Sequence, residues 1–206
     1  MFRSAIFGAI LISAAAAPSA TAQTVAPMTT PAVLVVSGGQ ASYHAREQLV
    51  GNTLPTDAVG TTTNVSGSIG LNPDGSVAAD QSTISVDLTS LTSDESMRDN
   101  FIKRNTLQTS QFPAAIFVPD QVRGLTSLPT SGQASFELTG KLTIHGVTQP
   151  AAWQVTATFD NGTVSGTATT SIQLTDYAMT PPRIGPVLSI DNGLILQLDF
   201  VATSQA

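Results

Sequence analysis

The sequence contains no cysteine. No disulfide, thiolate metal site or cysteine nucleophile can therefore form, and no lipid-modified cysteine can anchor the chain. We expect packing alone to hold the fold, which is feasible because a chain of 206 residues buries enough surface without covalent links.

Charged residues are also scarce, at 11% of the chain, and the 14 acidic residues outnumber the 8 basic ones. The resulting net charge of −6 argues against nucleic acids and anionic membrane surfaces as partners, because both repel an acidic protein. Neutral or apolar partners are favoured instead. The only histidines are His44 and His145, which excludes a histidine-rich metal site and leaves a mixed site with carboxylates as an alternative.

A long apolar run occurs only near the beginning of the sequence. Arg3 precedes an apolar run over 5–17, and small residues follow at 20–22. This order is typical of a secretory signal peptide, and the run is short for a membrane span, although an uncleaved anchor is the alternative. The expected division is a signal peptide at 1–22 cleaved after Ala22, a flexible leader at 23–31, and one periplasmic domain at 32–206.

The remaining sequence alternates between apolar and polar residues with a period of two, which is typical of half-buried β-strands. The alternation is found at 42–50, 62–71, 83–88, 115–118, 134–144, 152–159, 163–174 and 194–201. Turn signals with Asn or Asp followed by Gly lie at 72–75, 160–162 and 191–193. Many short strands joined by tight turns predict an antiparallel sandwich or barrel.

One hairpin is especially clear. Alternation places Phe136, Leu138, Leu142 and Ile144 on one face of a strand, and Trp153, Val155, Ala157 and Phe159 on one face of the next. Gly146 can take a positive φ, and Pro150 cannot donate a hydrogen bond to a neighbouring strand. We therefore expect the chain to reverse between Gly146 and Pro150.

One segment breaks the alternation. Thr92 and Glu95 have the spacing of a capping box ahead of 96–104, which predicts a short helix there. We expect Met97, Phe101 and Ile102 to face the sheet, and Arg98, Asp99, Lys103 and Arg104 to face water. Asp87 and the Arg98-Asp99 pair form either a polar cluster that pins the helix to the barrel end or separate solvated charges.

Four segments resemble the YceI family of secreted lipid-binding barrels, in the order and spacing of that family. They are GKLTIHGVTQP at 140–150, SVDLTSL at 85–91, Arg98-Asp99 followed by Phe101-Ile102, and QFPAAIF at 111–117. The resemblance extends from about residue 42 to the end. At 174–179 this chain reads LTDYAM where the family tends to show Arg-x-Asp-Phe-Gly-Met, so no role of that arginine transfers here.

The resemblance implies an all-β fold, a closed antiparallel eight-stranded lipocalin-like barrel with one short helix. It also implies that the barrel is a binding or carrier protein that holds a polyisoprenoid or a related long-chain amphiphile, and that it is not an enzyme. Relatives are often associated with cytochrome b561-type membrane proteins, which suggests an isoprenoid quinone as cargo and such a protein as a partner. A homodimer is a further option.

A barrel of about this strand number has an interior that side chains just fill, or that holds one small ligand. Small inward residues on one wall and large ones on the others predict a slot for an apolar chain. The predicted ligand-binding residues are Tyr43, Phe117, Phe136, Leu138, Leu142, Trp153, Val155, Phe159, Gly166, Ala168, Leu196, Leu198 and Phe200. Alternatively these residues only fill the core, which would make the chain a ligand-free partner-binding or stress-protective module.

Two polar residues carry open interpretations. His145 lies in the most distinctive motif, but without a serine or carboxylate at an obvious partner spacing, so a turn-stabilising hydrogen bond is favoured over catalysis. The absence of a Gly-x-Ser-x-Gly motif also disfavours a hydrolase. Glu47 shares a face with Tyr43, so it is either an inward group that recognises a ligand head or a sign that the face is reversed.

Overall fold

The computed structural model describes residues 32–49, 55–72, 74–125, 127–182 and 187–205, so the expected signal peptide and leader lie outside the described residues. The strands are β1 (Ala32–Leu49), β2 (Thr56–Thr62), β3 (Val65–Leu71), β4 (Val77–Asp87), β5 (Thr92–Ser93), β6 (Ala114–Arg123), β7 (Ser131–Ile144), β8 (Val147–Asp160), β9 (Thr163–Gln173) and β10 (Val187–Gln205). Helix α1 (Ser96–Phe101) continues as the π-helical turn η1 (Ile102–Thr106), and η2 (Leu174–Tyr177) is a 3-10 turn. Within these ranges, none of the helices has the length and apolar character needed to cross a membrane.

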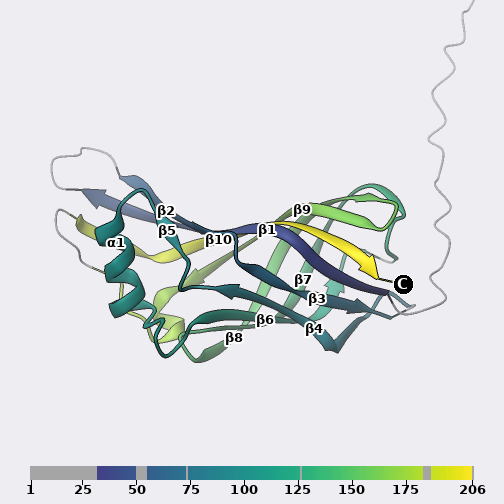
Figure 1. Cartoon of the computed structure of the whole chain (residues 1–206), viewed down its shortest axis with the longest axis horizontal. Helices are drawn as coiled ribbons and strands as arrows, with labels where there is room; N and C mark the ends of the chain where they lie inside the picture. Colours follow the sequence, from purple (N-terminus) through teal and green to yellow (C-terminus); the bar gives the residue numbers. More distant parts are fainter. Residues whose placement is uncertain (1–31, 50–54, 73, 126, 183–186, 206) are drawn as a thin grey trace, which may run out of the picture.

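Eight antiparallel strands close into an elongated barrel, with α1 near one end and the C-terminus at the other (Figure 1). Around the ring the order is β1, β3, β4, β6, β7, β8, β9 and β10, and β10 pairs again with β1. Strand β2 pairs with the second half of β1, and the two-residue β5 pairs with β2, so both extend the wall toward α1. The predicted closed barrel with one short helix is confirmed.

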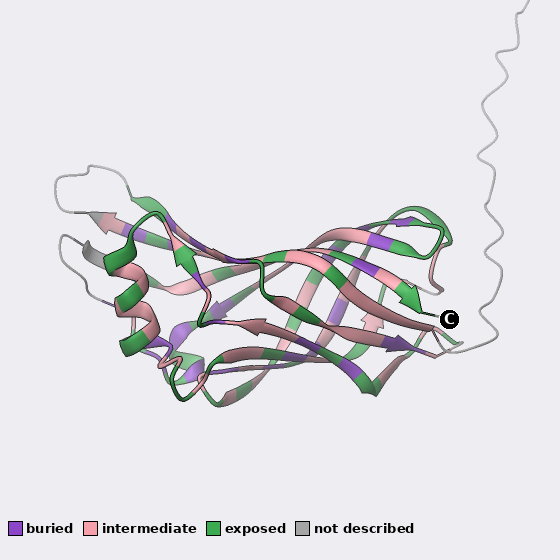
Figure 2. Ribbon diagram, in the orientation of Figure 1, coloured by how far each residue is buried: buried purple, intermediate pink, exposed green. Residues whose placement is uncertain are grey.

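Alternate residues of each strand face the interior, as the period-two pattern predicts. On β8, Val155, Ala157 and Phe159 are 4%, 1% and 3% exposed, whereas the residues between them are exposed. The same alternation of buried and exposed residues is visible along the ribbons in Figure 2. The apolar core therefore lies along the axis of the barrel.

The β7–β8 hairpin forms as predicted, but its turn is earlier than expected. His145 and Gly146 have φ values of 52° and 75°, and they are the two turn residues. Pro150 lies inside β8, opposite Lys141. A proline is tolerated there because β8 has no partner on its other side before Gln154.

Some of the other predicted turns and strands form and others do not. The turns at 72–75 and 160–162 form, but the expected turn at 191–193 is wrong, because these residues lie within β10. The side chain of Asn192 accepts a hydrogen bond from the Thr175 amide at 3.1 Å and donates one to the Thr175 hydroxyl at 2.8 Å. Asn192 thus ties η2 to β10 instead of reversing the chain. The expected strand at 62–71 corresponds to β3 over 65–71, whereas Thr62 is the last residue of β2.

The predicted helix is present, but its cap and its orientation differ from the prediction. Glu95, rather than Thr92, caps the helix, and its side chain accepts from the Met97 amide at 3.2 Å. Met97 is 69% exposed, whereas the side chain of Arg98 is only 11% exposed. The predicted faces are therefore wrong for these two residues, because Arg98 contacts a buried carboxylate on β1.

The barrel wall has an unpaired seam between β4 and β6. Pairing runs from Asp87 opposite Ala114 to Ile84 opposite Phe117 and then stops. Residues 79–82 of β4 also lack a paired partner on β3, where the register shifts. The buried Ser82 hydroxyl compensates locally, because it accepts from the Gly70 amide at 2.9 Å and donates to the Ala78 carbonyl at 2.7 Å.

We predict that the amides of 79–82 exchange with deuterium faster than those of 84–87, because the latter are paired on both sides and the former are bulged out. Hydrogen exchange with mass spectrometry on overlapping peptides of β4 measures this difference. Equal protection of the two halves would mean that the seam is closed by pairing in solution.

The candidate ligand cavity

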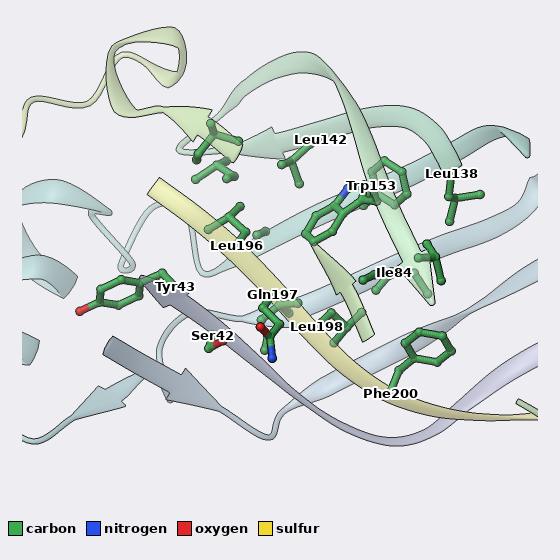
Figure 3. Close-up of a pocket in the computed structure, with 18 of the residues that line it drawn as sticks. Ser42, Tyr43, Ile84, Leu138, Leu142, Trp153, Leu196, Gln197, Leu198 and Phe200 are labelled. Atoms are coloured by element: carbon green, nitrogen blue, oxygen red, sulfur yellow. The ribbon is translucent and has the colours of Figure 1, made fainter. Parts of the chain in front are cut away.

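An apolar cavity of about 240 Å³ occupies the barrel interior. Of the predicted ligand-binding residues, those that line it are Tyr43, Phe117, Phe136, Leu138, Leu142, Trp153, Val155, Phe159, Ala168, Leu196, Leu198 and Phe200. Figure 3 shows side chains from separate strands, such as Leu142, Trp153 and Leu196, converging on one space. A wall of this composition suits an apolar ligand, and the binding role of each residue stays a prediction.

Gly166 does not line the cavity, contrary to the prediction that it provides ligand space. A Cβ at this position would lie 2.2 Å from the Thr156 carbonyl oxygen and 2.8 Å from the Ala157 Cα. Gly166 therefore allows β9 to approach the backbone of β8. Alternation correctly placed this residue on the inward face but could not reveal how close the neighbouring strand lies.

Trp153 and Phe117 form the aromatic part of the wall. Their ring centroids are 5.8 Å apart with an interplanar angle of 59°. The indole Nε1 of Trp153 is buried and has no hydrogen-bond partner among the described residues. Because the sequence has one tryptophan, its fluorescence reports on the cavity alone.

The sequence analysis missed part of the wall. The additional lining residues include Leu34, Val36, Ile69, Ile84, Val86, Leu88, Leu91, Ile102, Leu107, Leu174 and Met179. Leu34 and Val36 belong to an apolar run at 32–36 that shows no alternation, so no inward face could be assigned. Several of the others lie in turns between strands, where periodicity carries no signal.

A polar cluster lies where α1 meets the barrel. Glu47 faces inward, with a side chain only 5% exposed, and its Oε1 is 3.5 Å from the Arg98 Nη1. The Arg98 Nη2 contacts Asp94 and lies 3.2 Å from the Ser93 hydroxyl. Asp99 accepts from the Ser93 amide at 3.0 Å and from its hydroxyl at 2.5 Å. Glu47 is therefore inward, and the predicted face is not reversed, whereas its recognition of a ligand head stays a prediction.

Asp87 does not join this cluster. It accepts from the Thr89 amide at 2.8 Å and from the Thr89 hydroxyl at 2.6 Å, and the Asn64 side chain donates to it at 3.4 Å. The hydrogen bond from the Thr89 hydroxyl is the main cause that lowers the pKa of Asp87. Asp87 thus closes a local turn, and the predicted cluster of Asp87 with Arg98 and Asp99 is wrong in that member.

Tyr43 lines the cavity beside the polar cluster, and its ring is so close to Gly60 that a Cβ there would lie 2.3 Å from a ring carbon. In Figure 3 its hydroxyl points away from Trp153 and the leucines. Burial is the largest cause that raises the pKa of Tyr43, to about 12, and Arg98 opposes this shift. The phenol is therefore uncharged at neutral pH.

His145 holds the β7–β8 turn against η2. Its Nδ1 lies 3.3 Å from the Tyr177 carbonyl oxygen, and its ring meets Phe112 edge to face with centroids 4.7 Å apart. The sequence predicted a hydrogen bond that stabilises the turn itself. The structure shows instead a bond from the turn to η2. In the part of the chain that the structure describes, no three acidic or histidine side chains are grouped to hold a metal ion.

The model of the YceI-like domain family matches residues 40–202. The chain belongs to the YceI-like domain family. A UPF0312 protein of Pseudomonas putida strain W619 is 33% identical over 116 residues, which are 52% of this chain and 57% of that relative. The YceI-like chain thus spans little more than half the length of the curated relatives it matches.

Two solved structures share the YceI-like fold. BcnA of Burkholderia cenocepacia superimposes with a TM-score of 0.60 at 18% identity, covering 80% of this chain and 96% of BcnA. A polyisoprenoid binding domain from Saccharophagus degradans, implicated in plant cell wall breakdown, gives 0.60 at 11% identity, covering 84% and 98%. At these identities the likeness is one of fold.

We predict that Gly166→Ala lowers the free energy of unfolding by about 1 to 3 kcal/mol, because the new Cβ meets the backbone of β8. Gly38→Ala on β1 is the matched control, since a Cβ there meets nothing within 4 Å. Urea denaturation measures both variants. Equal destabilisation would contradict the role of Gly166 as a close-approach residue.

We also predict that the free energy of unfolding falls as the pH rises from about 10 to about 12, because Tyr43 then ionises in the unfolded chain but not in the folded one. Below pH 10 this contribution is fully present. Tyr43→Phe should make the free energy of unfolding fall less steeply over this pH range. Tyr177→Phe should leave the part of the fall that is due to Tyr43. Urea titrations over this pH range test it, and identical curves for Tyr43→Phe and the parent would refute it.

Proposed function

We propose that this protein binds a polyisoprenoid, an isoprenoid quinone or a similar long-chain lipid inside its barrel and carries or stores it in the periplasm. The observation that carries the proposal is the apolar cavity through the core. Two further points support it: YceI-like proteins are typically periplasmic, and the similar domain from Saccharophagus degradans is a polyisoprenoid binding domain.

Chain length matters for such a ligand. Each buried CH2 contributes about 0.8 kcal/mol, so ten carbons supply roughly 8 kcal/mol, against about 4 to 15 kcal/mol lost on association. Only a lipid with many apolar carbons gains enough to bind tightly. Long isoprenoid chains meet this condition, whereas short amphiphiles do not.

The other readings of the sequence receive less support. A filled barrel that serves only as a partner-binding or stress-protective module is disfavoured by the cavity. A hydrolase centred on His145 is disfavoured because its Nδ1 is 3.3 Å from the Tyr177 carbonyl oxygen and its Nε2 is buried, with no nucleophile bonded to it among the described residues. A cytochrome b561-type membrane protein as the donor or acceptor of the lipid, and a homodimer, stay predictions from the family resemblance.

Native mass spectrometry of the exported protein, followed by organic extraction, is the direct test. We expect a bound mass that extracts as a polyprenyl chain or an isoprenoid quinone. Added lipid should also change the fluorescence of Trp153, which lines the cavity. A lipid-free mass that persists after incubation with such lipids would refute the carrier function.

A variant pair locates the binding site. Ala168→Leu adds bulk to the cavity wall and should weaken lipid capture by about tenfold or more, provided that its thermal unfolding confirms a folded barrel. Thr169→Leu adds similar bulk at the next position of β9, outside the wall, and should bind as the parent does. Equal capture by both variants would place the lipid elsewhere.

A further inference from the structure

The cavity wall carries one cationic side chain among its described residues, and that cation is already paired. Arg98 lines the cavity, and its guanidinium contacts Glu47 and Asp94. A third carboxylate, Asp99, is held beside them through Ser93, which also contacts Arg98. Three acidic groups thus surround one basic group, so the described wall of the cavity offers no spare positive charge at the α1 end.

The other approach to the cavity is acidic as well. A polar surface groove along the seam between β4 and β6 shares Gly75, Val122 and Leu125 with the cavity wall. The charged residues that line this groove are Asp74, Asp120 and Arg123. Arg123 is paired with Glu137, with its Nη1 3.3 Å from the Glu137 Oε1. The described lining of this groove therefore also offers a lipid head no unpaired cation.

These surroundings are unsuitable for a phosphate or diphosphate head. An anion moved out of water into an apolar wall is destabilised by several kcal/mol unless a cation or several donors compensate. Protein sites for phosphate supply free Arg or Lys side chains or unoccupied backbone amides. The amide of Met97 at the start of α1 is already occupied by the Glu95 carboxylate.

The polar atoms at the α1 end are instead suited to a neutral oxygen. The Tyr43 hydroxyl has no hydrogen-bond partner among the described residues, and it is protonated at neutral pH. The Glu47 Oε2 and the Arg98 Nε are buried without partners there. Tyr43 and Arg98 both line the cavity, so a hydroxyl that can donate and accept and a guanidinium that can donate complement an alcohol or a carbonyl there.

We infer that the lipid held in this barrel has an uncharged head, an alcohol or a carbonyl, which lies against Tyr43 and Arg98 at the α1 end. The inference rests on the proposed lipid-binding function and narrows its ligand class to lipids without a phosphate. Among isoprenoids, polyprenols and quinones qualify, and polyprenyl phosphates do not.

The test compares a polyprenol with its monophosphate at the same number of isoprene units, by Trp153 fluorescence and by native mass spectrometry. We expect the alcohol to bind at least about tenfold more tightly, because a negative charge near a cluster in which carboxylates outnumber the cation is disfavoured by this order. Tyr43→Phe, which keeps the ring and removes the hydroxyl, should weaken binding of the alcohol and leave that of a head-free polyprenyl hydrocarbon unchanged.

Removing carboxylates from the cluster should admit the phosphate. Asp94→Asn should narrow the difference in affinity between the polyprenol and its monophosphate, and Glu47→Gln should narrow it further. The Asp94 side chain is 87% exposed, so this position tolerates the change. Asp57→Asn is the control, because it removes a carboxylate from the exposed pair with Arg46 and should change nothing.

The outcomes separate the two proposals. A monophosphate that binds the parent as tightly as the alcohol would overturn the neutral head and leave the carrier function standing. Failure of both lipids and of the hydrocarbon to bind would refute the carrier function itself. A preference for the alcohol that survives Asp94→Asn and Glu47→Gln unchanged would also overturn the inference, because the carboxylates would not be its cause.

Discussion

The pairing of β1 with β10 is the contact on which the barrel depends. It runs from Val33 opposite Gln205 to Leu49 opposite Val187. Because the chain has no cysteine, no covalent link holds the two strands together, and the ladder alone closes the ring. The ladder shifts register at three points, and such bulges bend strands, which lets two long strands follow a curved wall. Without this closure the inward faces of the other strands would meet water instead of one another.

The closed ring explains why space remains inside. An eight-stranded barrel has an interior that side chains can just fill, so a few small residues decide whether a cavity is left. Here Ala45, Ala168 and Ala202 are buried and line the cavity. The inward Gly166 has a different role, because it brings two strands together. In this wall alanine leaves volume, whereas glycine shortens the distance between strands.

The sequence predicted those features that depend on neighbouring residues. Alternation placed Trp153 and Val155 on the cavity side, because the two-residue period of a strand is a local property. It failed where a distant partner decides. Met97 and Arg98 were assigned to the wrong faces because their orientation depends on Glu47, and the turn at 191–193 was wrong because Asn192 bonds to η2. The closure of the barrel and its number of strands were predicted from the family resemblance, because the alternation of residues along single strands does not determine them.

The buried pair of Arg98 and Glu47 serves to orient helix α1 rather than to stabilise the fold. Its residues are 51 positions apart, and the desolvation of a buried ion pair offsets much of its attraction. Apolar contacts such as those of Ile102 already hold this segment against the core. The pair instead fixes the rotation of α1, with Met97 in water and a guanidinium in a wall of carbon. Because carboxylates cancel its charge, the helix presents hydrogen-bond donors to the cavity without an excess of positive charge.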